Sequence, residues 1–565
     1  MGFAHEYATA IMHRGRIPME PVGFAPDWSD RPRKGKFYTG AESFPLPDGD
    51  DAAPGPAATV QEGVFGNADP KERCFSLPLL GGMLLDSYGR TGRRLGVQAN
   101  TDLPSLPLYT DANWSRGTAS GGGLYPATVY WVNGPGGPLA PGVHHYSTTH
   151  HAMQRLLTGD VSAEVREAAG LGPGPCPDMT TDQFLVLGVK FWQNAFKYNS
   201  FCMHAVSMDV GALLQTWRMW ARARGLRIEP ALWFDEERIA RLLGLDVLDE
   251  GVFAVVPLTW ERTAPPSTGH TAGPAARVRR TESERSRRVI PFETVRRIQA
   301  ATLEKATARP EPGALVPAAV SPEPPSSAPG AALVALPEPA PLGLGVREAL
   351  RRRRSSFGRF DARRALAADQ LAATLAAAAS ASVGGDATGR EGLFGQDGPD
   401  GQDGQDGHVR HVRQDTPRLT RLYVFVNHVE GIAPGAYAYE PGSAHGLRLV
   451  KAGPPGDFLQ RNYFLSNYNL EQAAAVVVPA VRTAAVLDAV GDRGYRLVNA
   501  TVGAVAQTFY TAATALGVGS GVALGFDTVS FVEELELAES GEAPLLIMLV
   551  GHERPGSADF RYEIA

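Results

Sequence analysis

One apolar pattern occurs twice in this chain. Residues 210–217 (VGALLQTW) place apolar side chains at the spacing of an amphipathic helix, and residues 502–509 (VGAVAQTF) repeat the pattern 292 positions later. Both copies continue for about two more helical turns and end at a glycine, Gly225 or Gly517. Two unrelated amphipathic helices can look alike by chance, so a duplication requires that the offset recurs elsewhere.

The offset does recur along the chain. Four segments return at offsets of 292 to 294: YWVN 130–133 as YVFVN 423–427, APG 140–142 with Tyr146 as APG 433–435 with Tyr439, ALWFD 231–235 as ALGFD 523–527, and ER 261–262 as ER 553–554. We therefore predict two tandem domains, 1–262 and 346–565, each mixing strands and helices in an α+β pattern. Their expected arrangement is a pseudo-dimer within one chain, packed through the repeated helix with Gly211 and Gly503 as close-contact points.

The segments between these predicted domains have a different composition. Residues 263–345 are rich in proline, alanine and glycine and predict a linker with one amphipathic helix at 292–306. A low-complexity stretch at about 383–415 predicts a disordered insert in the second domain. In the first domain, the apolar stretch 79–96 predicts a helix closed by glycine and arginine.

Bulk properties restrict the function classes. A chain of 565 residues exceeds what one core supports, and its net charge of −6 implies no broad basic surface for nucleic acid. No apolar run is long enough to span a membrane, and the N-terminus lacks the apolar core of a signal peptide, so we expect a cytoplasmic protein. Three separated cysteines indicate a reducing compartment and no metal site.

The two copies differ at loops that suit different parts of one ligand. Only the first has the glycine platform of Ser120, Gly121, Gly122 and Gly123, because QDTP stands at the matching offset in the second. Only the second has RRRRSSFGRF at 351–360, where arginines beside hydroxyls suit a phosphate, although a solvated helix face is an alternative. Together the differences favour one composite site, with the symmetry-related site lost.

A third difference follows the repeated helix. The second copy has glycines at 519, 521 and 525, where the first has Arg227, Glu229 and Trp233. Glycines let the backbone approach a flat ligand closely. The alternative interpretation is that they only make the loop flexible. We therefore expect the close-approach loop to belong to the second copy.

The repeated helix and the loops that differ between the two copies resemble a known family. The chain is similar to tandem nitroreductase-fold proteins of the SagB/McbC type, the FMN-dependent dehydrogenases of azole-containing peptide biosynthesis. The Arg-x-Ser motif of that family falls on Arg354, Ser356 and Phe360; its further basic residue is Gly358 here, with Arg353 or Arg359 as substitutes. The resemblance implies FMN between the halves, held by the following set: Arg353, Arg354, Ser355, Ser356, Ser120, Gly121, Gly122, Gly123, Ala523, Leu524, Gly525 and Arg554.

The same resemblance assigns a catalytic pair. Azole-forming members carry a Lys-Tyr signature shortly before the repeated helix, where this chain has Lys197 and Tyr198. Oxidation of a thiazoline or oxazoline removes a proton and a hydride from neighbouring ring carbons, so the implied roles are a base for Lys197 and a proton relay for Tyr198. A lysine acts as a base only where burial or a neighbouring cation favours its neutral form. Without the resemblance, a surface lysine beside a core tyrosine is the simpler interpretation.

The function implied by the resemblance is oxidation of azoline rings in a ribosomally made precursor peptide. Its expected partners are that peptide and a cyclodehydratase complex, and a further oligomer is open. Alternatives are another flavin oxidoreductase, such as a cyclic dipeptide oxidase or an NAD(P)H-dependent nitro or ene reductase, or a module that docks the peptide without catalysis. The sequence does not choose between thiazole and oxazole, and it does not identify the electron acceptor.

Overall fold

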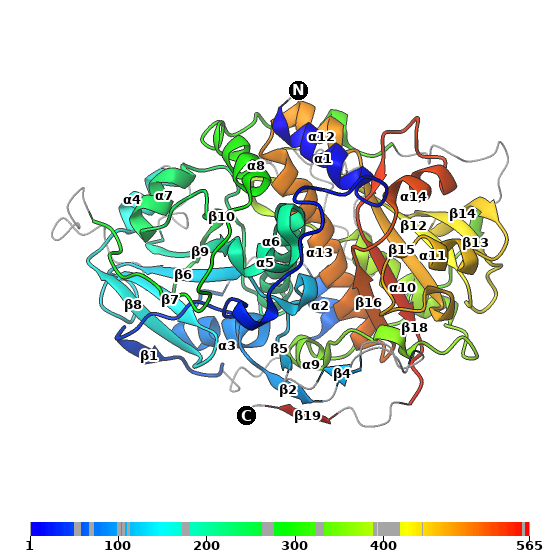
Figure 1. The fold of residues 1–565 in the computed structure, drawn as a ribbon. Coiled ribbons are helices and arrows are strands. Elements are labelled where there is room, and N and C mark those ends of the chain that lie inside the picture. The colour runs from blue at the N-terminus through cyan, green and yellow to red at the C-terminus, as the bar shows by residue number, and fades with distance from the viewer. Residues whose placement is uncertain are drawn as a thin grey trace.

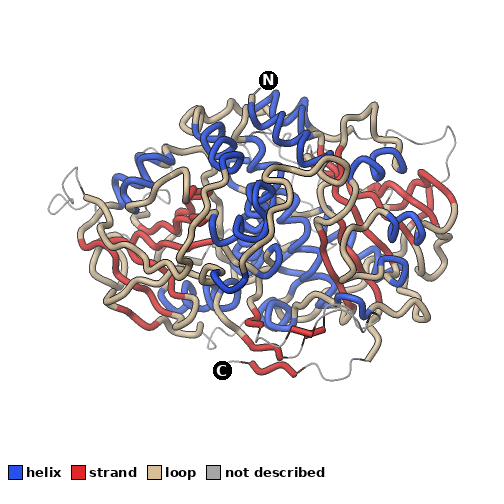
Figure 2. The backbone as a smooth tube through the Cα atoms, in the orientation of Figure 1, coloured by secondary structure: helices blue, strands red, loops and turns tan. Residues whose placement is uncertain are grey.

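The computed structural model of the chain describes most of the two predicted domains and part of the segment between them. The described residues are 2–49, 58–66, 73–95, 97–98, 103, 108–109, 113–171, 181–262, 276–321, 333–387, 393, 418–442, 445–555 and 560–563. Two sheets lie on either side of a central layer of helices (Figures 1 and 2). No described helix combines the length and the apolar composition needed to cross a membrane.

The first sheet has six antiparallel strands from the N-terminal half. Their order is β1-β8-β7-β6-β9-β10. The bounds are β1 Ser43–Pro45, β6 Ala127–Asn133, β7 Gly142–Ser147, β8 Ala152–Thr158, β9 Gln183–Lys190 and β10 Glu250–Pro257. The strands of its centre, β6 and β7, are buried along their whole length; β6 is mostly apolar, whereas β7 also buries His144, His145 and Ser147.

The second sheet repeats this order with added edges. It runs β11-β14-β13-β12-β15-β18-β16, and β17 pairs with β15. The bounds are β11 Leu333–Ala335, β12 Thr420–Val426, β13 Gly435–Glu440, β14 Gly446–Ala452, β15 Ala475–Val481, β16 Gly519–Ala523, β17 Ala543–Pro544 and β18 Ile547–Gly551. The predicted strands at 130–133 and 423–427 therefore occupy equivalent central positions, β6 in the first sheet and β12 in the second.

The two sheets also share their registers. Asn133 pairs with Gly142 where β6 meets β7, and Val426 pairs with Gly435 where β12 meets β13. A register shift follows Val143 in one sheet and Ala436 in the other. Strand pairing and local irregularity thus recur at the offset seen in the sequence.

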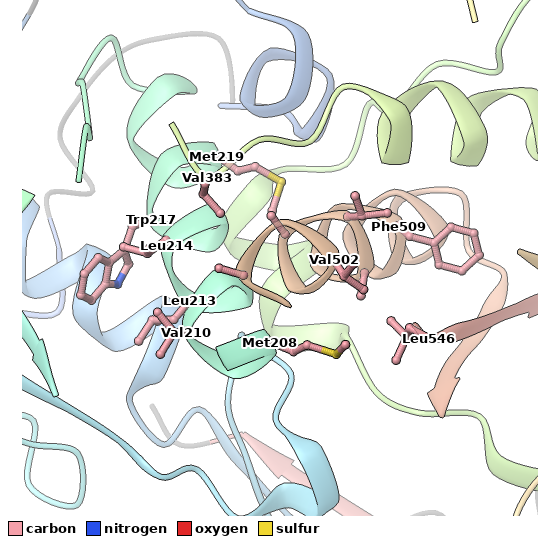
Figure 3. Close-up of a cluster of buried hydrophobic side chains, with 14 of the residues drawn as sticks. Met208, Val210, Leu213, Leu214, Trp217, Met219, Val383, Val502, Phe509 and Leu546 are labelled. Atoms are coloured by element: carbon pink, nitrogen blue, oxygen red, sulfur yellow. The ribbon is translucent and has the colours of Figure 1, made fainter. Parts of the chain in front are cut away.

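The repeated sequence pattern forms two long helices that cross in the centre of the molecule. These are α6 (Cys202–Arg222) and α13 (Gly494–Ala515), and their apolar side chains interlock in Figure 3. A Cβ atom at Gly211 would overlap the carbonyl oxygen of Ala500, and one at Gly503 would overlap that of Met208. Both predicted close-contact glycines therefore lie where the two helix backbones touch.

The remaining helices cover the sheets and the central pair. They are α1 Phe3–His13, α2 Val60–Phe65, α3 Leu77–Tyr88, α4 Ser162–Ala168, α5 Trp192–Tyr198, α7 Glu236–Leu243, α8 Glu293–Leu303, α9 Val346–Arg352, α10 Ala368–Ala379, α11 Gly456–Arg461, α12 Thr483–Val490 and α14 Thr528–Glu534. Helix α8 lies within the predicted helical segment 292–306. Of the predicted insert, Val383, Ala387 and Leu393 are buried, and the rest beyond residue 387 lies outside the described residues.

The helix expected at 79–96 is shorter than predicted. Helix α3 ends at Tyr88, and Gly89 takes an extended conformation. Residues 92–95 instead form β2, which pairs with β5 (Asn113–Ser115) and with β19 (Phe560–Glu563) from the far end of the chain. A second small sheet pairs β3 (Val97–Gln98) with β4 (Leu108–Tyr109). The expectation was wrong because β2 is stabilised by pairing with a distant strand.

A buried charge cluster also joins the two halves. The carboxylate of Glu236 on α7 accepts hydrogen bonds at 2.8 Å from both Arg493 and Arg496 at the start of α13. The two arginines hold the pKa of Glu236 below its usual value, although burial opposes this. Loss of one partner from such a cluster leaves a buried charge uncompensated, so the cluster helps to fix how α13 sits on the first half.

Candidate functional site

The structure brings the predicted catalytic pair to the predicted glycine platform. Lys197 and Tyr198 form the end of α5, and both side chains are half-buried. A Cβ atom at Gly122 would lie 2.5 Å from the Tyr198 hydroxyl and 2.8 Å from Lys197 Nζ. Gly122 has a φ of +61°, so only glycine is free of strain there. Two segments more than seventy residues apart in sequence thus meet at one point.

The backbone directly after the Lys197–Tyr198 pair adopts a strained conformation. Asn199 has a φ of +42°, a value that non-glycine residues rarely adopt, and it connects α5 to the short helix Asn199–Phe201. Lys197 Nζ lies 4.8 Å from the centre of the Tyr198 ring and 5.9 Å from that of Trp28. Strained residues of this kind concentrate at functional sites, which agrees with a positioned pair.

A carboxylate on the repeated helix holds the glycine platform in place. Asp209 accepts hydrogen bonds from the Ser120 hydroxyl at 2.6 Å and from the Gly121 N–H at 2.8 Å. The Ser120 oxygen in turn accepts from the Tyr125 N–H at 2.9 Å. Burial raises the pKa of Asp209 to about 7, while the two hydrogen bonds oppose the rise. Ser120, predicted to bind the cofactor, therefore also acts as a loop brace.

The raised pKa of Asp209 predicts a pH effect on stability. A carboxyl whose pKa is higher in the folded state binds more protons there than when unfolded, so its contribution falls as pH rises from about 4 to about 7. Asp209→Asn removes the titrating group, so the stability of the variant relative to the parent should rise across this window. Denaturant unfolding of both proteins between pH 4 and pH 8 measures the difference, and a constant difference would contradict the assignment.

The second half supplies the opposite wall of the site. Burial raises the pKa of Tyr463 on this wall, and the charge of Tyr198 adds to the rise. The next residue, Phe464, donates its N–H to the Gly525 carbonyl at 2.8 Å. Phe464 and Leu465 are 46% and 51% exposed, so this wall presents apolar side chains to solvent next to the predicted loop 523–525.

Hydroxyl and aromatic groups continue from this wall to the predicted phosphate-binding residues. The Tyr468 ring lies 6.3 Å from that of Tyr463 and stacks on Phe357 at 5.8 Å. The Tyr510 hydroxyl hydrogen-bonds with Ser355 at 2.9 Å and accepts from the Val522 N–H at 3.0 Å. A continuous row of side chains therefore joins the Lys197–Tyr198 pair to Ser355.

The predicted phosphate-binding residues converge at the end of that row. Arg354 pairs with Glu553 at 2.6 Å, and the neighbouring Arg554 donates to the Gly358 carbonyl. The Ser356 N–H donates to the Ser520 carbonyl at 2.9 Å, which ties this corner to β16. The structure thus places Arg354, Ser355, Ser356 and Arg554 together.

Two parts of this region make contacts that the sequence did not indicate. Arg353 is buried and donates to the carbonyls of Gly117 and Arg116 at 2.8 and 3.0 Å, so it joins the halves through the backbone. Gly519 and Gly521 do not face open space, because Cβ atoms there would lie 2.5 Å from Glu553 Cγ and from a Tyr468 ring carbon. In contrast, a Cβ at Gly123 would meet nothing within 4 Å.

Sequence reasoning missed several residues of the site. Arg14 on α1 donates to the Leu524 carbonyl and lies 4.6 Å from the centre of the Phe201 ring, so the N-terminal segment links both walls. Trp28, Tyr463 and Tyr468 were missed as well. The segment NYFLSNY at 462–468, which contains Tyr463 and Tyr468, has no counterpart in the first half. This lack of a counterpart could have marked the segment as part of an asymmetric site. Among the described residues, no group of three or more acidic, histidine or cysteine side chains could hold a metal ion.

Comparisons with known proteins agree with this fold. Residues 417–552 match the Nitroreductase family. A protein of Methanocaldococcus jannaschii is 34% identical over 140 residues, which cover 23% of this chain and 63% of that protein. A crystal structure from Anabaena variabilis covers 98% of this chain and 100% of its own, with 20% identity and a TM-score of 0.65. Both proteins carry the name "putative nitroreductase".

A third similarity is to part of the Escherichia coli microcin synthetase McbBCD complex. It covers 36% of this chain and 70% of that chain, with 17% identity and a TM-score of 0.28. This chain spans only 63% of the curated relative named above. Residues 417–552 therefore match the Nitroreductase family, and the chain has a nitroreductase-like fold, in agreement with the predicted mixture of helix and sheet.

Proposed function

We propose that the chain consists of two duplicated nitroreductase-like domains that form a pseudo-dimer and share one FMN site. The equal strand registers and the matching register shifts of the two sheets support duplication. The crossing of α6 and α13 at Gly211 and Gly503 supports a two-fold arrangement. The site is asymmetric, because the phosphate-binding residues come from one half and the Lys-Tyr pair from the other.

The residues present fit a flavin that carries a phosphate. Arg354 and Arg554 supply guanidinium groups, and Ser355 and Ser356 supply hydroxyls, in one corner. Arg354, which pairs with Glu553 here, would pair with the phosphate of a bound flavin instead, since a phosphate is also an oxyanion. The Gly121–Gly123 platform of one half and residues Ala523, Leu524 and Gly525 of the other would hold the ring system.

Arg354→Ala should weaken FMN binding by about tenfold to a hundredfold, because a charge-assisted hydrogen bond contributes about 1.5–3 kcal/mol. Arg461→Ala is the matched control, since Arg461 lies on α11, is exposed and belongs to no part of the site. Fluorescence titration of FMN into flavin-free protein measures both affinities. Equal affinities for the two variants would contradict the placement of the phosphate at Arg354.

The activity that we propose is oxidation of an azoline ring in a precursor peptide to the aromatic azole. The observation that carries it is the contact of both Lys197 and Tyr198 with Gly122. FMN, when bound, accepts the hydride. Lys197 removes the proton from the adjacent ring carbon, and Tyr198 donates a hydrogen bond that orients the ring or relays the proton. Trp28, Phe464 and Leu465 provide apolar, partly exposed surface beside the pair against which a peptide could pack.

Lys34 brings a second cation close to the Lys197–Tyr198 pair. The charge of Lys197 contributes to lowering the pKa of Lys34, so the two ammonium groups lie within electrostatic reach of each other.

The experiment that tests this activity combines the purified chain, FMN and an azoline-containing peptide. Each oxidised ring lowers the peptide mass by the mass of two hydrogen atoms, as one hydride and one proton leave. Mass spectrometry under air should show this loss, and bleaching of the flavin absorbance should accompany it when oxygen is excluded. A peptide of unchanged mass with flavin bound would contradict the proposal. The precursor peptide and a cyclodehydratase are the partners that this activity requires.

A second candidate is NAD(P)H-dependent reduction of a nitro or alkene group. The match of residues 417–552 to the Nitroreductase family favours it. The two activities differ in the direction of hydride transfer. Rapid bleaching of the flavin by NAD(P)H, with no bleaching by azoline peptide, would select the reductase.

A further inference from the structure

A cavity of about 450 Å³ lies against the central strands of the first sheet. Its volume is within the range of small-molecule sites. Besides a few glycine and apolar residues, the lining is rich in basic and hydroxyl-bearing side chains, among them Arg33, Lys34, Arg90, Arg116, Arg285 and Thr128. None of the residues assigned above to FMN lines it. No carboxylate lines the cavity among the residues that the structure describes.

Arg116 is the most informative residue of the lining, because it is only 2% exposed. Its guanidinium lies between the rings of Tyr88 and Tyr125, at 4.6 and 4.2 Å from their centres. One nitrogen donates to the Lys34 carbonyl at 3.0 Å, whereas Nε and Nη1 have no hydrogen-bond partner in the described structure. A buried guanidinium with two unused donors indicates a missing acceptor.

The other cations of the lining reinforce this charge. Arg90 also has a buried Nε without a hydrogen-bond partner. Burial and the cations Arg116, Arg31, Lys197 and Arg90 lower the pKa of Lys34 to about 8. Because Lys34 is an exposed residue, we attribute the direction to the cations. Lys36, in contrast, is buried and already paired with Glu250.

We infer that this cavity binds a small phosphate compound carrying at least two negative charges. Lys34, Arg90 and Arg116 form no ion pair with any described carboxylate, so a single negative charge would leave most of the lining uncompensated. Guanidinium groups pair with phosphate oxygens through two parallel N–H donors, and the hydroxyl of Thr128 can complete the shell. Diphosphate and a nucleoside phosphate both have this chemistry, and Phe37, which is 42% exposed in the lining, would contact only the nucleoside.

The test is calorimetric titration of diphosphate, and separately of AMP, into the full chain loaded with flavin in a buffer without phosphate. We expect saturable binding of at least one probe with one site per chain. Arg116→Gln and Arg90→Gln should each weaken it by about tenfold or more, because a charge-assisted hydrogen bond is lost. Arg93→Gln is the matched control, because Arg93 is exposed on β2 and does not line the cavity.

The outcomes distinguish a nucleotide from diphosphate as the ligand, and they show which results would overturn the inference. Binding of AMP that Phe37→Ala weakens identifies a nucleotide site, and binding of diphosphate alone identifies a site for the phosphate groups; both support the inference. Absence of binding, or an equal loss in Arg93→Gln, would overturn it. Release of FMN by diphosphate would also overturn it, because the cavity would then be the flavin phosphate site. Since Arg116 is buried, Arg90→Gln decides if Arg116→Gln fails to fold. Azoline oxidation is not needed for any of these readouts.

Discussion

Lys197→Ala should abolish azoline oxidation while FMN remains bound. Removal of a positioned acid or base costs about a hundredfold to ten-thousandfold in rate. Lys197 Nζ reaches Gly122 at the junction of the glycine platform and the second-half wall, where a base can meet the reacting carbon. The turnover rate of the variant, from the mass loss of an azoline peptide, should therefore fall by at least about two orders of magnitude.

Two controls separate catalysis from folding. Lys305→Ala removes an exposed lysine that was not assigned to the site and should leave the rate unchanged. Tyr198→Phe keeps the ring that lies 4.8 Å from Lys197 Nζ and removes only the hydroxyl, so it should lower the rate less than Lys197→Ala does. Unchanged turnover of Lys197→Ala with full flavin content would show that Lys197 is not the base.

Gly211→Val should prevent stable folding. The first added carbon would overlap the Ala500 carbonyl oxygen, and both helices are buried along nearly their whole length, so neither can move away cheaply. Overpacking of a core costs about 1–3 kcal/mol where some relaxation is possible, and more where backbone meets backbone. We expect a loss of more than about 3 kcal/mol, seen in denaturant unfolding or as loss of soluble protein.

The matched control is Gly343→Val. A Cβ at Gly343 would meet nothing within 4 Å, and its φ is not in the left-handed region. The same chemical change should therefore alter the free energy of unfolding by less than about 1 kcal/mol. A Gly211→Val variant as stable as Gly343→Val would contradict the packing of α6 on α13.

The internal repeat made much of the fold predictable. Equal offsets at the strands, the turns and the long helix predicted which segments occupy equivalent places, and β6, β12, α6 and α13 occupy them. The glycines at 211 and 503 were predicted as contact points because both copies retain them. Local pattern was insufficient at 79–96, where β2 forms through pairing with β19 at the far end of the chain.

The site was less predictable because its parts come from segments with no counterpart in the other half. The resemblance placed Lys197 and Tyr198, but the sequence did not show that Asp209 holds Ser120 and Gly121. Nor did it show that Tyr468 lies against Gly521, since this contact depends on how the loop at 462–468 packs. Arg353 looked like a phosphate ligand by composition, yet its hydrogen bonds run to the carbonyls of Arg116 and Gly117.

The central proposal is one composite flavin site shared by two unequal halves. The most direct test is the flavin content of the chain, purified and saturated with FMN, freed of excess ligand, and then denatured to release the cofactor. Absorbance of the released flavin against protein concentration gives the ratio. One FMN per chain is the predicted result, and two per chain would contradict the loss of the symmetry-related site.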